Sequence, residues 1–445
     1  MLVWASTLIR PDALTRATPH GPWNCRGLDI WAVFCAARDG DVGDLDRLLA
    51  EDRNLHRAEY WYTQPLHFAV REGQLEAVRR LLQAGADPDW RGLSGDSLRT
   101  AALDRAHVEV TELLDSWERC PGGRSTPLAE GSIHRAAAAD DPELVRALLE
   151  EDGRRLHEAD QRQLTPLHRA VAASARRVVD VLLELGADPN WPEGPGAPRG
   201  AALYTASAAG DRGLVELLLN HGADPNATID SAGSPTFAAA TPEIRELLIA
   251  HGGKLDPYDW VFLGEEDEAL RAVEADPESA QVGCGGVLAA ACKLGKPGLV
   301  ERLLALGVRV ASSLTGCRSY LWSDVEALKL LLASGMDANL PDWMHATPLH
   351  SLCERDGRGR PRPHRLECFE LLLAAGADLS ARDEDYRSTP LGWAARNGLE
   401  EMVDLLLARG ASLHEGEGPR WATPAAWARR RGHDALSERL ASAGC

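Results

Sequence analysis

The chain contains little lysine and has no regular cysteine spacing, and these two features bear on its source and on its redox compartment. Lysine occurs only at positions 254, 293, 296 and 329, whereas arginine is frequent, a bias typical of a high-GC genome that points to a bacterial source. Nine cysteines are scattered without a Cys-x-x-Cys pair or a dense disulfide framework. This distribution predicts reduced thiols in a cytosolic protein.

Long apolar runs are also missing. No stretch is long enough to span a bilayer, and the first residues are interrupted by prolines and lack the apolar core of a secretory signal. We therefore expect a cytoplasmic location and no membrane contact. The formal net charge of −19 argues against DNA or RNA as the main partner, because phosphate binding needs concentrated Lys and Arg.

One stretch recurs along most of the chain. Residues 388–413 read STPLGWAARNGLEEMVDLLLARGASL, and near-copies begin at Gln64, Thr165 and Thr347. The spacing agrees, since Pro390 to Pro424 is 424 − 390 = 34 residues. A period of about 33 residues that carries Thr-Pro-Leu-His-x-Ala is typical of ankyrin repeats, and the chain strongly resembles that family. The resemblance implies an all-α solenoid of about 12 to 13 helix-turn-helix units with β-hairpin fingers, some of them degenerate.

The repeats divide the chain into segments. Residues 1–27 match no repeat and are either a disordered lead, a strap along the first helices or the product of a misplaced start. The remaining segments are a first array (28–117), a break or hinge (118–131), further units (132–229), degenerate units (230–340) and a final array with a cap (341–445) that contains an Arg-rich insertion at 355–365.

Each unit follows from its residues. Thr at the helix start caps an early backbone N–H, and Pro in the first turn fixes φ. Leu and Ala pack inward, and Gly after the second helix supplies a left-handed residue. The histidines of the Thr-Pro-Leu-His motif, His67, His168 and His350, are interpreted as structural, because this imidazole bonds between neighbouring repeats in the family.

The family resemblance implies that residues before Thr-Pro-Leu-His and before the mid-repeat Gly contact a protein partner on the concave face of fingers and first helices. Large aromatic side chains are also favoured at interface hot spots. The predicted partner-binding residues are Tyr60, Trp61, Tyr62, Arg71, Glu72, Trp90, Trp191, Trp343, Met344, Tyr386, Arg396, Asn397 and Trp421. The tryptophans on helical segments, Trp31, Trp260, Trp322, Trp393 and Trp427, are expected in the core.

Two charged segments stand apart from this set. The arginines of 355–365 offer bidentate contacts to phosphate or to an acidic patch, and the alternative is a solvated loop. The acidic run at 383–385 is expected to be an exposed finger tip.

Signatures of enzymes are missing from the sequence: there is no GxSxG, P-loop, HExxH or dinucleotide fingerprint. Cys353 with His350 resembles a nucleophile–base pair only on paper. We predict a non-enzymatic scaffold that binds a protein partner, with no cofactor and no metal. The alternatives are an enzyme or small-ligand protein with a site in 230–340, or anion and nucleic-acid contact through the 355–365 loop.

Overall fold

The computed structural model describes residues 8–15, 17, 19–20, 25–60, 63–91, 96–118, 132–160, 164–191, 202–227, 233–282, 285–310, 321–322, 324–355, 360–414 and 420–443. The chain forms two compact units, and we treat each by itself. The first unit is Arg16–Leu255, and the second unit is Asp256–Cys445 together with Met1–Thr15. Their boundary lies within the expected degenerate region 230–340, and the expected break at 118–131 lies outside the described residues except for Glu118, which ends α6.

The first unit begins with two short strands that pair antiparallel ahead of the helices. Its elements are β1 (Pro19–His20), β2 (Cys25–Arg26), α1 (Gly27–Asp39), α2 (Val42–Glu51), η2 (Arg53–Arg57), α3 (Pro65–Arg71), α4 (Leu75–Ala84), α5 (Leu98–Asp104), α6 (Val108–Glu118), α7 (Ile133–Ala138), α8 (Pro142–Glu151), η3 (Gly153–His157), α9 (Pro166–Ala172), α10 (Arg176–Glu184), α11 (Ala202–Ala209), α12 (Arg212–Asn220), α13 (Pro235–Ala238) and α14 (Pro242–Ala250).

The second unit combines one N-terminal 3-10 turn with the remaining helices. Its elements are η1 (Asp12–Thr15), α15 (Pro257–Leu263), α16 (Glu266–Ala275), η5 (Pro277–Gln281), α17 (Gly286–Lys293), α18 (Pro297–Ala305), α19 (Val325–Ala333), α20 (Pro348–Leu352), α21 (Arg365–Ala374), α22 (Pro390–Arg396), α23 (Glu400–Ala408), η7 (Arg420–Ala422), α24 (Pro424–Arg430) and α25 (Asp434–Ala443).

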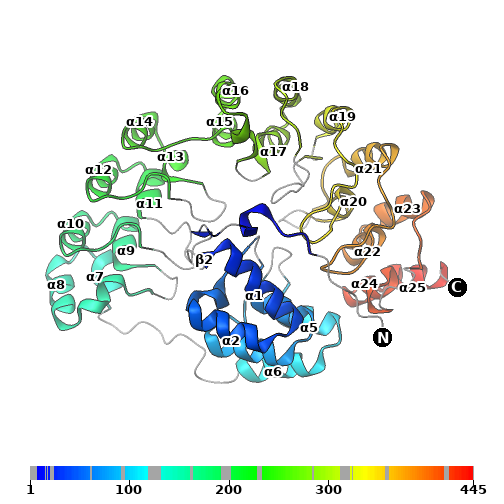
Figure 1. Cartoon of the computed structure of the whole chain (residues 1–445), viewed down its shortest axis with the longest axis horizontal. Helices are drawn as coiled ribbons and strands as arrows, with labels where there is room; N and C mark the ends of the chain where they lie inside the picture. Colours follow the sequence, from blue (N-terminus) through cyan, green and yellow to red (C-terminus); the bar gives the residue numbers. More distant parts are fainter. Residues whose placement is uncertain are drawn as a thin grey trace. The chain divides into compact units, whose positions relative to one another are not determined.

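The helices follow one another as antiparallel pairs along each unit (Figure 1). Within the described residues, twelve pairs and the single helix α19 agree with the predicted number of units. First helices pack on first helices, as in α7–α9–α11 and α20–α22–α24, and second helices pack on second helices, as in α2–α4–α6. The weakened repeats keep this order: α15–α16 and α17–α18 are complete pairs, and α13 is shortened to four residues.

The predicted start and end signals of the repeat are confirmed. The Thr165 hydroxyl accepts from the backbone N–H of His168 at 3.2 Å, and Pro166 follows in the first helical turn. After the second helices, Gly376 and Gly410 have φ of 89° and 92°. This left-handed conformation lets the chain reverse toward the next finger at no steric cost for glycine.

Asparagine side chains join consecutive repeats. The Nδ2 of Asn339 donates to the Gly376 carbonyl at 2.9 Å, and its Oδ1 accepts from the N–H of Asp378 at 2.6 Å. Asn190 and Asn226 make the same pair of bonds with the repeat that follows each of them. One amide thus satisfies two backbone groups left open by the turn after a second helix.

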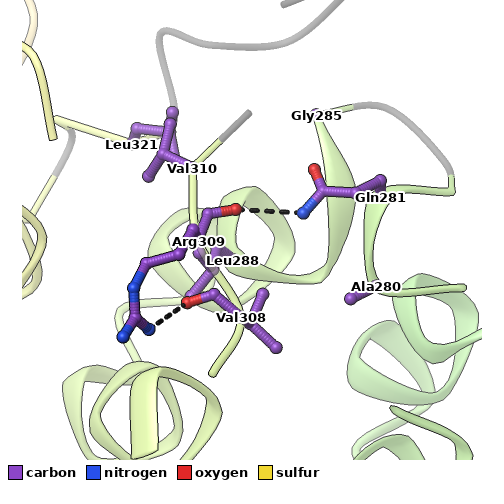
Figure 2. A pocket seen from close by; sticks show the side chains of 8 residues that line it. All are labelled: Ala280, Gln281, Gly285, Leu288, Val308, Arg309, Val310 and Leu321. Carbon is purple, nitrogen blue, oxygen red and sulfur yellow. Dashed lines mark hydrogen bonds between the residues drawn. The ribbon is translucent and has the colours of Figure 1, made fainter. Parts of the chain in front are cut away.

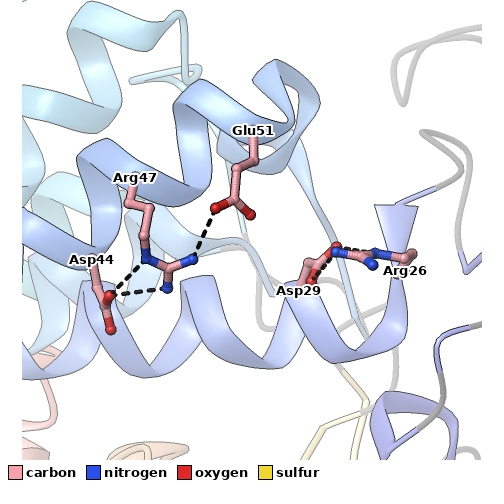
Figure 3. Close-up of polar contacts among 5 residues, drawn as sticks. All are labelled: Arg26, Asp29, Asp44, Arg47 and Glu51. Carbon is pink, nitrogen blue, oxygen red and sulfur yellow. Dashed lines mark hydrogen bonds and ion pairs between the residues drawn. The ribbon is translucent and has the colours of Figure 1, made fainter.

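Charged side chains cover the outer surface of the helices. Figure 3 shows Arg47 of α2 between Asp44 (3.0 Å) and Glu51 (3.1 Å), and Arg26 paired with Asp29 (2.6 Å) in the first turn of α1. These pairs follow the i, i+3 and i, i+4 spacing of a helix. They are largely exposed, so the core carries the stability of the repeat.

That core consists of buried Leu, Val and Ala from successive repeats. One continuous cluster runs from Ile133 to Leu248 in the first unit, and another runs from Val261 to Leu440 in the second unit. Trp322, Trp393 and Trp427 are buried as predicted, and Trp31 and Trp260 are half-buried.

Candidate functional site

Two fingers carry an isolated β-bridge among the described residues, Tyr60–Thr63 and Arg91–Ser97. Tyr60 and Thr63 exchange two backbone hydrogen bonds of 3.1 Å. In the finger before α20, the Asp342 N–H donates to the Ala346 carbonyl at 2.9 Å. The Asp342 carboxylate also accepts from the N–H groups of Met344 (2.8 Å) and Ala346 (2.9 Å), which fixes the turn from inside.

The predicted residues of the first two fingers are mostly covered by the chain itself. The Tyr60 side chain is 3% exposed and the Arg71 side chain is buried, while Glu72 is half-buried and pairs with Arg71 at 2.8 Å. Trp90 is half-buried and packs edge-on against His67, with ring centroids 5.4 Å apart. Trp61 and Tyr62 lie outside the described residues.

Trp191 is the most exposed of the described aromatic candidates, at 43%. Its ring stacks on His157, with centroids 4.0 Å apart and planes inclined by 22°. The His157 Nε2 accepts from the backbone N–H of Asp188 at 3.0 Å, and burial lowers the pKa of this imidazole. The indole is thus held in one orientation while much of it faces solvent.

In the second unit, four aromatic rings form a continuous series across the last repeats. Tyr386 meets Trp393 and Trp427 edge-on at 5.1 and 5.5 Å, and Trp421 meets Trp427 at 5.9 Å. The Arg396 guanidinium lies 4.1 Å from the Tyr386 ring centroid, a cation–π distance. Tyr386 is 8% and Arg396 is 9% exposed, so both stabilise the stack, whereas Trp421 is half-buried at its end.

The remaining predicted partner-binding residues also include both buried and half-buried side chains. Trp343 is 7% exposed, and Met344 beside it is half-buried. Asn397 is half-buried and donates to the carbonyl of Cys353 at 2.8 Å, which ties α22 to the preceding repeat. The structure therefore leaves Glu72, Trp90, Trp191, Met344, Asn397 and Trp421 partly open to solvent among the described candidates.

The expectation that 383–385 is an exposed tip is wrong. Asp383 is 1% and Glu384 is 3% exposed. The Asp383 carboxylate accepts from the N–H groups of Tyr386 (2.5 Å) and Ser388 (3.1 Å) and from the Trp393 indole (2.9 Å). The acidic residue folds its own finger inward, because it satisfies three donors that would otherwise be buried without a partner.

The Arg-rich insertion lies between α20 and α21, as predicted, and three of its described arginines bond within the repeat array. Arg355 donates to the Asn397 carbonyl at 2.8 Å, and Arg362 donates to the Ser351 carbonyl and to Glu354, both at 3.0 Å. Arg365 pairs with Glu401 at 2.8 Å. These contacts occupy the guanidinium groups of Arg355, Arg362 and Arg365.

Both ring nitrogens of His350 are occupied by backbone groups, so His350 is not placed to act as a base for Cys353. His350 Nδ1 accepts from the Thr347 N–H at 3.0 Å, and its Nε2 lies 3.1 Å from the Ser388 carbonyl. Burial lowers the pKa of His350 to about 4 and raises the pKa of the Cys353 thiol far above its ordinary value. A neutral imidazole committed to the backbone cannot activate a buried thiol. The predicted structural role of His350 is confirmed.

A shallow recess lies in the weakened repeats, where the sequence leaves room for a ligand site. It holds about 190 Å³ of space, part of it open solvent, and its walls are Ala280, Gln281, Gly285, Leu288, Val308, Arg309, Val310 and Leu321. Figure 2 shows that Gln281 donates to the Arg309 carbonyl (3.0 Å) and that Arg309 donates to the Val308 carbonyl (2.9 Å). Both polar side chains therefore bond to the backbone, and none of the eight described lining residues is a catalytic acid, base or nucleophile.

The part of the chain that the structure describes contains no group of three or more His, Cys, Asp or Glu placed to hold a metal ion. None of its helices combines the length and the apolar character needed to cross a membrane.

Sequence reasoning missed the polar residues that build the fingers from inside. Asp160, Asp342 and Asp383 each accept backbone N–H groups of their own finger, and Asn190, Asn226 and Asn339 bridge repeats. An Asp a few residues before the Thr-Pro motif and an Asn closing Gly-x-Asp-x-Asn were visible signals for both roles.

Two protein-family models match this chain. A family model described as ankyrin repeats in three copies matches residues 98–193, 133–229 and 288–417, which together exceed half of the chain. A model described as ankyrin repeat matches residues 64–93.

The similar proteins share only part of their length with this chain. Transient receptor potential cation channel subfamily A member 1 of Homo sapiens is 22% identical over 166 residues, 37% of this chain and 15% of that protein. The probable E3 ubiquitin-protein ligase XBOS33 of Oryza sativa subsp. japonica is 34% identical over 120 residues, 26% of this chain and 23% of that protein. The solved ankyrin repeat domain of human ASB11 is 23% identical, with a TM-score of 0.26, over 50% of this chain and 98% of that one. The chain spans less than a quarter of either curated relative, so their names describe those proteins.

Proposed function

Because the chain belongs to the ankyrin-repeat family, we propose that it is a non-enzymatic scaffold that binds a protein partner through its fingers and first helices. Ankyrin repeats are generally protein–protein interaction modules, and stacked repeats present extended binding surfaces. We further propose that the partner contacts the exposed aromatic residues of the fingers.

The observation that carries it is the Trp191–His157 stack. An indole that is 43% exposed and yet held at 4.0 Å on a backbone-anchored imidazole loses little conformational entropy when a partner covers it. Tryptophan is also enriched among hot-spot residues. Trp90 and Trp421 offer smaller, half-buried indole surfaces of the same kind.

The two alternatives receive no support from the described residues. The described residues that line the recess include no catalytic acid, base or nucleophile, and Arg355, Arg362 and Arg365 of the 355–365 insertion bond to carbonyls and carboxylates of the array.

The test is binding by matched variants. A partner captured from lysate of the source organism and identified by mass spectrometry would be purified and titrated against wild type, Trp191→Ala and Leu185→Ala. Leu185 ends the same repeat's second helix and is 42% exposed, which matches the exposure of Trp191. We expect Trp191→Ala to weaken binding at least tenfold, the loss of about 1.4 kcal/mol or more that a hot spot carries, and Leu185→Ala to leave it unchanged.

Equal affinity for all three proteins would contradict a role for Trp191. The same comparison with Trp90→Ala and Trp421→Ala would then show whether another finger carries the contact.

A further inference from the structure

Residues 8–15 precede the first unit in sequence but belong to the second unit by their contacts. The backbone N–H of Ile9 donates to the carbonyl of Trp343 at 3.1 Å. Trp343 lies on the finger before α20, more than three hundred residues further along the chain. The start of the described chain is therefore docked on a finger of the last repeats.

The docked segment has a defined shape of its own. Residues 8–10 lie outside any helix, Pro11 favours an extended conformation for Arg10, and η1 follows at once. The Arg10 Nε and a terminal guanidinium nitrogen donate to the Leu14 carbonyl at 2.9 and 2.7 Å, and the Leu14 N–H donates to the Pro11 carbonyl at 2.9 Å. The arginine thus clamps the turn and aligns the apolar residues on either side of it.

The apolar side chains of this segment are covered. Leu8 is 9% exposed, Leu14 is fully buried and Pro11 is buried. Seven residues cannot enclose three of their own side chains, so other parts of the protein cover them. The burial of two leucines and a proline adds an apolar contribution to the docking beyond the single main-chain hydrogen bond.

The finger that receives the segment is rigid. The Asp342 carboxylate fixes its turn through the N–H groups of Met344 and Ala346, and the Met344 carbonyl accepts from Glu384 of the next finger at 2.8 Å. The Trp343 carbonyl, between these anchors, is the group that accepts from the docked segment. A finger held on both sides presents one fixed acceptor to an extended chain, the main-chain recognition that extended peptides use elsewhere.

We propose that the finger at Trp343 is a docking site for an extended apolar peptide segment, and that residues 8–14, Leu-Ile-Arg-Pro-Asp-Ala-Leu, occupy it as an intramolecular ligand. This deepens the proposed function, on which it rests, by naming the kind of partner that this finger takes: a protein segment with leucine or isoleucine on both sides of an Arg-Pro pair. Such a partner competes with the chain's own segment, whose docking is an intramolecular event because the segment is covalently attached.

The experiment uses the full-length chain and a fluorescein-labelled peptide of residues 6–17. Ile9→Pro removes the N–H that donates to Trp343, and Ala17→Pro is the control, because Ala17 is exposed and follows the docked segment. Thermal unfolding would first establish that each variant is folded. Anisotropy titrations then measure peptide binding to wild type, Ile9→Pro and Ala17→Pro, with a peptide carrying Ile9→Pro as the specificity control.

The expected result is at least tenfold tighter peptide binding to Ile9→Pro than to wild type or Ala17→Pro, and no binding of the control peptide. Hydrogen exchange would show protection of residues 340–346 when the peptide binds. Equal binding to all three proteins, or no binding to Ile9→Pro, would overturn the proposal. A wild-type dimer that Ile9→Pro converts to monomer would overturn the intramolecular occupancy, because the segment would then dock on a second copy.

The result of the peptide titration is independent of the result of the Trp191 binding experiment. The peptide titration needs no protein partner, so loss of the Trp191 effect and loss of peptide binding can be told apart.

Discussion

The Asp383 carboxylate closes the finger before α22 from inside. Burial raises its pKa from 3.8 to about 7, and the donors Trp393, Tyr386 and Ser388 offset part of that rise. A carboxyl group whose pKa is raised on folding contributes stability that is fully present below its unfolded pKa. That contribution is lost as pH rises from about 4 through about 7.

The variant Asp383→Asn tests the predicted direction of this pH dependence of stability. At pH 4 Asp383 is protonated in the folded protein, and its hydroxyl oxygen can still accept a hydrogen bond whereas an amide nitrogen cannot, so we expect the variant to be less stable than wild type at this pH. The wild type should then lose stability relative to the variant as pH rises to 7, since only the wild type gives up a buried proton. Denaturant midpoints at several pH values would measure this, and a constant difference across the window would contradict it.

The Asn339 amide is a second residue whose contacts reach into the next repeat. Asn339→Ala removes the bonds to Gly376 and Asp378, and we expect a loss of about 1–2 kcal/mol, at about 1 kcal/mol for each bond. Asn220→Ala, at the exposed end of α12, is the control and should change stability little. Urea unfolding measures both; equal effects would show that the bridge adds nothing.

At the scale of the helix pair, glycine has two different roles. Gly376 follows α21 with φ of 89°, and Gly298 lies in the first turn of α18 with ordinary helical geometry; an added Cβ would meet nothing within 4 Å at either position. Gly376→Ala should therefore destabilise by about 1–2 kcal/mol through backbone strain alone. Gly298→Ala should be neutral or stabilise by up to about 1 kcal/mol. Thermal unfolding of the two variants would compare them, and a shift of the same sign in both would contradict the argument.

A helix pair also tolerates an insertion between its two helices where hydrogen bonds hold the ends of the inserted segment on the array. The insertion between α20 and α21 keeps the repeat in register because Arg362 returns to Ser351 and Glu354, while Arg355 reaches Asn397 of the next pair. An arginine-rich loop is in this way a structural part of the array.

For the whole molecule, each repeat packs on its neighbours, and the described core consists of separate clusters in the two units. Leu182 is fully buried in the first unit's cluster and Leu349 in that of the second. Each Leu→Ala change should cost about 3 kcal/mol locally. In an array with nearest-neighbour coupling, hydrogen exchange should speed up around the changed repeat and stay the same in the other unit. A uniform increase along the chain would show instead that both units unfold together.

The sequence by itself determined the repeat. Thr-Pro at the helix start, Leu and Ala at helical spacing and Gly after the second helix act through local backbone geometry and short-range packing. They therefore predicted helices such as α9 and α22 and the burial of Trp427.

The tertiary structure decided which polar and aromatic residues are open to solvent. Tyr386, Trp343, Arg71 and Asp383 look like finger-surface residues in sequence, yet neighbouring elements cover them, and Trp191 stays exposed on His157. No feature of the sequence predicted the docking of Ile9 on Trp343. Burial and long-range pairing depend on which segments meet in space, and a period of about 33 residues fixes only the neighbour of each repeat.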